Sequence, residues 1–312
     1  MTLTKIKKIG VLLCMLFISR IVIAQTSSSL SKEFDLAGER SIEAQYYIME
    51  SKLVNYSLDG TRTGNDVFRL YLKYEPSEQG EEYICTKFTV QLDDAPEVTV
   101  PVLDNWSYVY YPDIDEQGQV FGIDHSRFDN LKDENGNPIP PDKSYHVYNA
   151  FIDFHSFCNV FAQPTTEGRG IQDLTKIGQK IVHAAAFSEP PTNLGENIED
   201  GSFFKNGEIT LEFRGLGIVN DKTCAIIGYD SGESNYKMIS KPMPNFEVIT
   251  TGTSHYFGDI YKDLATNWVQ KVTLAEFVVS ETTLPMPPNT INSINEREII
   301  IKNVNEEEFN PQ

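Results

Sequence analysis

Alternation of apolar and polar residues with a period of two is the feature that most constrains this fold. Phe68, Leu70, Leu72 and Tyr74 are separated by polar, charged or aromatic residues. The same alternation recurs, more or less regularly, at residues 42–48, 84–92, 98–102, 209–213 and 268–274. Such runs are typical of strands that bury one face and leave the other in water. They predict many half-buried strands.

Turn-forming residues separate these runs. Asp59-Gly60, Gly64-Asn65 and the segment 93–96 interrupt the N-terminal part of the chain. Strands joined by short turns of this kind pair antiparallel. The sequence therefore predicts a mainly β fold: an antiparallel curved sheet, or an incomplete barrel or sandwich, with a short helical or irregular covering segment.

Two finer predictions concern which way side chains point. In the first run, Ile42, Ala44, Tyr46 and Ile48 are expected on one common face. In the last run, apolar residues change from even to odd positions at Phe277. A β-bulge produces such a change of face, which predicts a bulge near Ala275-Glu276.

Large aromatic residues are concentrated between residues 145 and 161. They recur at spacings of three and four, which suits one face of a helix. We predict a short helix here that covers the sheet. Core packing accounts for these rings more simply than a ligand site does, because large aromatics dominate ordinary cores.

The N-terminus has the pattern of an export signal. A basic start is followed by an apolar run at residues 9–18, with Val22 and Ala24 at the −3 and −1 positions of a cleavage site. The apolar run is too short for a transmembrane helix, and Arg20 interrupts it. The protein is thus expected to be exported, to the periplasm or the extracellular space, with no membrane span in the mature chain.

Composition divides the chain into five expected segments. These are a signal peptide (1–24), a flexible lead-in (25–40), an N-terminal β unit with the aromatic segment (41–162), a C-terminal β unit (163–284) and an acidic tail (285–312). The two β units are also compatible with one continuous domain. Within the tail, Ile299 to Ile301 is expected to form at most an edge strand.

Net charge limits the partners that can be expected, and cysteine content limits the disulfides. The formal net charge of −19 argues against a nucleic-acid partner, which needs a basic surface. Cys85, Cys158 and Cys224 follow the expected signal peptide. They allow one disulfide with a leftover thiol, or three separate buried thiols, which we favour.

The sequence offers only weak candidates for metal-binding residues. Asp113, Asp115 and Asp124 partly match a calcium loop, although an ordinary acidic turn explains them better. His155 and Cys158, at i and i+3, carry imidazole and thiolate ligand chemistry but no recognised spacing. No cofactor is predicted.

No catalytic residue is assigned either. The sequence contains no nucleophile elbow, P-loop or dinucleotide fingerprint. A thiolate pair of His155 and Cys158 is conceivable, but a packing cysteine is the simpler explanation. An enzyme is therefore less expected than a non-enzyme.

A ligand groove is the remaining candidate site. Trp106, Tyr108 and Tyr110 share one face of a predicted strand and, with Phe154, are the expected ligand-binding residues; core packing is the alternative. Our first hypothesis is a non-catalytic exported protein that binds a small apolar or amphipathic ligand. The alternatives are a structural or protein-interaction component of the cell envelope and, third, a hydrolase with an unrecognised site.

Overall fold

A computed structural model describes most of the chain. The described residues are 32–77, 80–112, 119–190, 198–243, 245–285 and 288–310. The expected signal peptide and the candidate calcium ligands Asp113 and Asp115 lie outside them.

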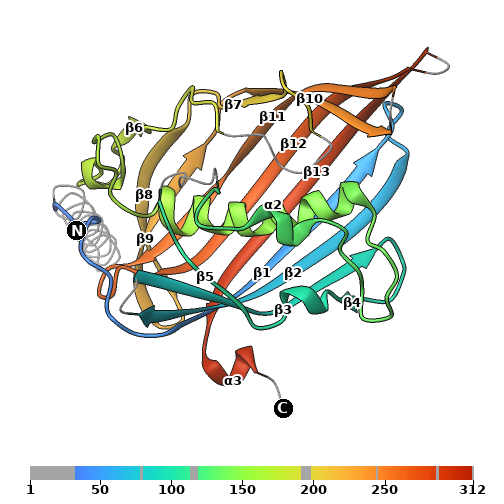
Figure 1. Ribbon diagram of the computed structural model, residues 1–312. Coiled ribbons are helices and arrows are strands. Elements are labelled where there is room, and N and C mark those ends of the chain that lie inside the picture. Colours follow the sequence, from blue (N-terminus) through green and yellow to red (C-terminus); the bar gives the residue numbers. More distant parts are fainter. Residues whose placement is uncertain are drawn as a thin grey trace, which may run out of the picture.

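The described residues form one antiparallel sheet of thirteen strands, as the alternation predicted. Figure 1 shows these strands with their labels. They are β1 (Gln45–Tyr56), β2 (Arg62–Ser77), β3 (Gly80–Leu92), β4 (Val98–Thr99), β5 (Trp106–Val109), β6 (Lys180–Val182), β7 (Phe203–Lys205), β8 (Thr210–Val219), β9 (Lys222–Asp230), β10 (Ser234–Met243), β11 (Phe246–Asp263), β12 (Val269–Pro285) and β13 (Pro288–Val304). The main order is β4-β3-β2-β1-β13-β12-β11-β9-β8-β6, so strands from both expected β units share one sheet.

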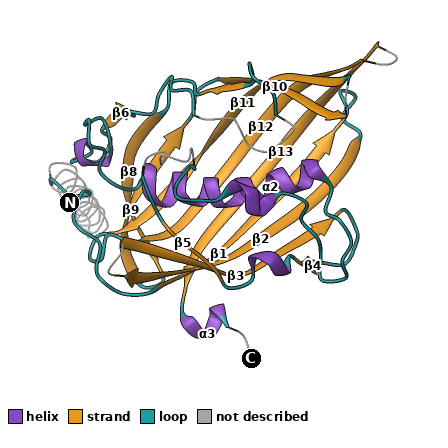
Figure 2. Ribbon diagram, in the orientation of Figure 1, coloured by secondary structure: helices purple, strands orange, loops and turns teal. Residues whose placement is uncertain are grey.

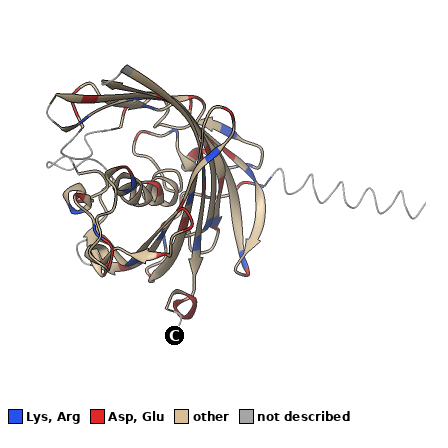
Figure 3. Ribbon diagram, turned by 90° about the vertical axis from the view of Figure 1, so that its right-hand side faces the viewer, with Lys and Arg blue, Asp and Glu red and all other residues tan. Residues whose placement is uncertain are grey.

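The sheet curves around a helix. Helix α2 (Pro141–His155) lies across its concave side (Figures 1 and 3). Pro141 stands in the first turn, where its missing N–H costs nothing, and a π-helical turn (Ser156–Val160) continues the helix. The predicted covering helix is confirmed. Its rings pack on the sheet: Phe151 stacks on Phe88 with centroids 5.9 Å apart.

The other helical elements are short (Figure 2). Three 3-10 turns are η1 (Pro101–Leu103), η2 (His125–Phe128) and η4 (Ile171–Asp173), and α3 (Glu306–Phe309) is one turn near the C-terminus. Among the described residues, no helix has the length and apolar character needed to cross a membrane.

Buried and more exposed side chains alternate along β2 as predicted, but in β1 and β12 the buried face is not the expected one. Phe68, Leu70 and Leu72 are buried as predicted. In β1, however, Tyr47 and Met49 face the core. The expected assignment of Tyr46 to the core face is wrong, because its ring packs instead against Phe309 of α3, at a centroid distance of 5.2 Å.

The predicted bulge in β12 is also wrong. Pairing with β11 and β13 continues through Ala275 and Glu276 without a shift in register. Glu276 stays on the inner face because Arg297 binds it there. Phe277 and Val279 consequently point outward and are 46% and 49% exposed.

The C-terminal segment is more ordered than expected. Instead of a short edge strand at 299–301, β13 covers Pro288–Val304 and lies between β1 and β12. Ile299 and Ile301 are buried in the core.

Residues 33–42 precede β1 and form a strap across one end of the sheet. The backbone N–H of Phe34 donates to Thr175 O at 2.9 Å, and that of Ser41 donates to Thr266 O at 3.0 Å. Phe34 and Leu36 are buried. Composition suggested a flexible lead-in here, whereas these contacts anchor the segment.

Candidate functional site

A pocket lies between the strap and the sheet. Its volume is about 420 Å³, which is within the range of small-molecule sites. It is lined by residues 37–42 of the strap, Tyr74 of β2, Glu81 of β3, Gln163 and Pro164 after the helix, and Lys262 of β11. Segments far apart in the sequence therefore meet here.

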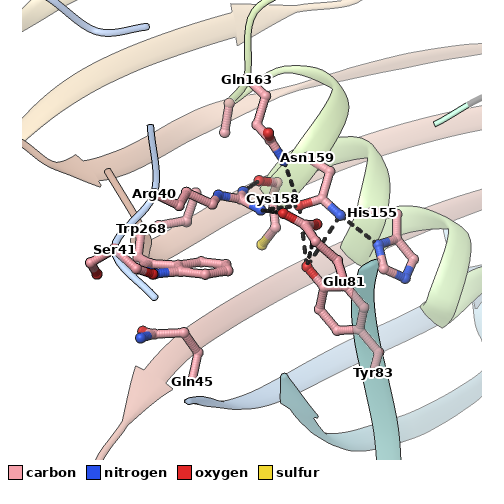
Figure 4. Close-up of polar contacts among 12 residues, drawn as sticks. Arg40, Ser41, Gln45, Glu81, Tyr83, His155, Cys158, Asn159, Gln163 and Trp268 are labelled. Carbon is pink, nitrogen blue, oxygen red and sulfur yellow. Dashed lines mark hydrogen bonds and ion pairs between the residues drawn. The ribbon is translucent and has the colours of Figure 1, made fainter. Parts of the chain in front are cut away.

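Arg40 is one of the residues that line this pocket. Its side chain is only 8% exposed. The guanidinium lies over the Trp268 ring, with Cζ 4.2 Å from the ring centroid. Trp268 is itself fixed, because its Nε1–H donates to Ser41 O at 2.9 Å. The strap and the aromatic ring thus hold Arg40 in a cation–π contact (Figure 4).

Neutral groups accept most of the hydrogen bonds of Arg40. Nη1 donates to Asn159 Oδ1 at 2.9 Å and Nη2 donates to the Cys158 carbonyl at 2.5 Å. With its amide oxygen turned toward Arg40, Gln163 accepts from Nη1 at 2.8 Å. The Nε–H is buried and has no acceptor among the described residues.

Glu81 is the only carboxylate in salt-bridge contact with Arg40 within the described part of the chain. Its Oε1 lies 3.4 Å from Nη1, and its side chain is 29% exposed. Tyr83 OH donates to its Oε2 at 3.5 Å. This ion pair is longer than the 2.7–2.9 Å of a close charge-assisted hydrogen bond.

Lys262 brings a second cation to the pocket. It is 1% exposed, and Nζ donates to Leu36 O at 2.6 Å and to Ala162 O at 2.8 Å. Burial, together with repulsion from Arg40, lowers the pKa of Lys262 to about 7. The charged and neutral forms of the amine are therefore both populated near neutral pH.

The predicted aromatic residues form a packed cluster beside the Arg40 pocket. Tyr108 and Phe154 are buried, whereas Trp106 and Tyr110 are partly buried against the core. The ring of Tyr108 lies 4.9 Å from that of Trp106, and the ring of Tyr110 lies 4.8 Å from that of His155. These four residues are not among those that line the pocket.

His155 joins the aromatic cluster to the Arg40 site. Its Nε2 lies 2.7 Å from Tyr108 OH and its Nδ1 lies 2.8 Å from Asn159 Nδ2. Asn159 in turn accepts from Arg40. Burial, reinforced by Arg40, lowers the pKa of His155 well below its ordinary value, so the ring is neutral. Since an amide NH₂ can only donate, Nδ1 accepts and Nε2 carries the proton.

The other predicted site residues have separate surroundings. Cys158 is a buried free thiol, as are Cys85 and Cys224. Burial raises the pKa of Cys158 to about 12. Asp124 caps the turn η2 and accepts from the Ser126 backbone at 3.0 Å. No group of three or more His, Cys, Asp or Glu residues with metal-site geometry occurs in the described part of the chain.

Sequence reasoning missed Arg40, Glu81 and Lys262. One signal was available: Lys262 follows Ile260 on the buried face of β11, where a lysine is unusual. Arg40 gave no local signal, because its partners lie about 120 residues further along the chain.

Comparison with known proteins gives no relative by sequence. No family model and no curated protein matches the chain. A solved structure with low similarity is OmpTdeltaL8, a loop L8 deletion mutant of OmpT, an outer membrane protein of Vibrio cholerae. It has 8% sequence identity and a TM-score of 0.15, over 84% of this chain and 99% of that one. A likeness this low carries no argument about function.

Proposed function

We propose that this is an exported, non-catalytic binding protein for a small amphipathic ligand, and that the pocket around Arg40 is its binding site. The observation that carries this proposal is a pocket of about 420 Å³ whose lining includes a largely buried arginine. Burying an arginine with mostly neutral partners is costly for a fold. A bound ligand that contacts the guanidinium would offset that cost.

The lining of the pocket suits a ligand with two different ends. Arg40 and Lys262 are charged or chargeable, whereas Ile42, Tyr74 and Pro164 offer apolar surface. Ile42 is 88% exposed. A ligand with an apolar chain would cover the Ile42 side chain and remove it from water.

A hydrolase using Cys158 and His155 has less support. Both ring nitrogens of His155 are engaged, one by Tyr108 and the other by Asn159. His155 is thus not in position to activate Cys158, and burial keeps the Cys158 thiol protonated at neutral pH.

Native mass spectrometry of residues 25–312, purified from the compartment to which the protein is exported, tests the proposal. We expect extra mass in the native spectrum that disappears on denaturation. The variant Arg40→Met should lose it. Arg69→Met is the matched control, because Arg69 pairs with Glu50 and Glu97 away from the pocket. A native mass equal to the bare wild-type chain would contradict the proposal.

A second candidate function is a structural or interaction role in the cell envelope. Phe257, Phe277 and Val279 favour it, because these exposed apolar side chains lie on adjacent strands of the outer face. If Phe277→Thr/Val279→Thr lowers the fraction of protein retained with the envelope while Arg40→Met does not, this function is preferred.

A further inference from the structure

The charges around the pocket identify the chemical class of its ligand. We infer that the pocket recognises an amphiphile with a carboxylate head, and that this carboxylate replaces Glu81 beside Arg40 and Lys262. The inference rests on the proposed function and adds the head group and the residue that it displaces.

The first argument is the incomplete neutralisation of Arg40. A guanidinium removed from water needs a close carboxylate, and bidentate contacts of about 2.7–2.9 Å are the strong form. Among the described residues, Glu81 at 3.4 Å is the only carboxylate in contact with Arg40, the other acceptors are neutral, and the Nε–H has no acceptor. An anion that bound Arg40 more closely than Glu81 does would therefore balance its charge better.

The second argument is that another buried amine lines the same pocket. Lys262 Nζ has acceptors for two hydrogen bonds among the described residues, Leu36 O and Ala162 O. A protonated amine has three donors. An incoming carboxylate would supply an acceptor for the third and would favour the charged form of the amine.

The third argument is that Glu81 is held loosely enough to leave. Its side chain is 29% exposed, so it can turn into water without becoming a buried unpaired charge. Its contacts with Arg40 and Tyr83 are both long, at 3.4 and 3.5 Å. Glu81 thus acts as a built-in competitor that occupies the position of the ligand head while the pocket is empty.

Cations fit this site poorly. The largely buried Arg40 guanidinium and the protonated amine of Lys262 would repel them. Glu39 also lines the pocket, but it is an exposed residue. A neutral head would leave the Arg40 charge without a closer anion.

Calorimetry with three amphiphiles of equal chain length tests the inference. The probes are octanoate, octanamide and octylammonium, titrated into the wild-type protein near pH 6.5. We expect octanoate to bind about tenfold or more tightly than octanamide, because a hydrogen bond to a charged group contributes about 1.5–3 kcal/mol. Octylammonium should bind most weakly.

Variants of the charged residues sharpen the test. Glu81→Gln removes the competing charge, so it should tighten octanoate binding about three- to tenfold, and its effect on octanamide binding should be smaller. Arg40→Met should weaken octanoate about tenfold or more, whereas the control Arg69→Met should not change it. Glu81→Gln keeps the test decisive if Arg40→Met fails to fold, because Glu81 is partly exposed.

The outcomes separate the two proposals. If octylammonium binds as well as octanoate, or if Glu81→Gln weakens octanoate binding, the carboxylate inference is overturned. If octanamide binds as tightly as octanoate, the binding function stands and the carboxylate inference falls. If none of the three probes binds and no native mass is added, both the inference and the proposed function are overturned.

Discussion

Arg40 and Arg297 are two buried arginines of this protein with opposite surroundings. Arg297, on β13, donates to Asp153 of α2 at 2.5 Å and to Glu276 of β12 at 2.6 Å. All three of these side chains are at most 15% exposed. In the part of the chain that the structure describes, Arg40 has one carboxylate partner, Glu81 at 3.4 Å, whose side chain is 29% exposed.

The two sites therefore have different consequences for the fold. Burial alone would lower the pKa of Arg297, but the Asp153 and Glu276 carboxylates outweigh burial and raise it. Such a network ties α2 to two strands, and no charge in it is available to a ligand. Arg40 lines the pocket, and Glu81 balances its charge only partly. Burial of a charged group is thus compatible with either role, and the partners decide between them.

The largest expected effect is on the free energy of unfolding of Arg297→Met. It leaves two carboxylates buried without their cation, which costs about 3–5 kcal/mol. Arg40→Met should cost less, about 1–2 kcal/mol, since it removes hydrogen bonds but also a poorly balanced charge. Urea unfolding measures both. The control Arg69→Met, at a partly exposed arginine whose carboxylate partners Glu50 and Glu97 are exposed, should cost about 1 kcal/mol or less.

The contrast between the two arginines would be contradicted if Arg40→Met lowered the free energy of unfolding as much as Arg297→Met does. Arg40 would then be a structural arginine of the same kind, and the argument for an available charge would fail. The slope of the unfolding curves should be equal among the variants, since a change in slope would indicate an altered unfolded state.

A medium-sized effect concerns pH and the second cation of the pocket. Lys262 has a pKa of about 7 in the fold and an ordinary value of 10.5. Between these values the unfolded state binds more protons, so this group makes stability rise with pH, by at most about 1.4 kcal/mol per pH unit. Below pH 7 both states are protonated and the contribution is constant at its least favourable value.

Unfolding of wild type and Lys262→Met between pH 6 and 9.5 measures this contribution. The difference in stability should be flat near pH 6 and should shift in favour of wild type as pH rises above 7. Taking the difference cancels the opposite effect of the buried thiols, whose raised pKa values destabilise the fold at high pH in both proteins. A pH-independent difference would mean that Lys262 titrates normally.

The sequence predicted the layers of this fold better than its sites. Strict alternation in β2 and the aromatic spacing of α2 depend on neighbours only a few residues away, and both were read correctly. The Arg40 site depends on contacts between residues 40, 81, 159 and 262, which no local pattern encodes. Local patterns therefore place Arg40 in a flexible lead-in and Asn159 in the aromatic segment, and they single out neither Glu81 nor Lys262.

Where strand faces were misjudged, the assumption that apolar residues point inward had failed. In β1, Tyr46 is outside because Phe309 of α3 covers it. In β12, the inner face becomes polar where Glu276 meets Arg297 and Ser254, whose hydroxyl donates to Glu276 at 2.6 Å. A buried ionic network thus reversed the usual polarity of the strand.

That reversal yields the smallest predicted effect. Phe277 and Val279 lie on the outer face, so Phe277→Thr and Val279→Thr should each change the free energy of unfolding by about 0.5 kcal/mol or less. A bulge that turned these side chains inward would make the same changes cost several kcal/mol, as for large-to-small core substitutions of about 2–5 kcal/mol. Leu274→Thr is the matched control on the buried face, 4% exposed, and should show the large loss. A small loss at Leu274 together with a large one at Phe277 would require the opposite assignment of faces, and it would remove Glu276 from the network that holds Arg297.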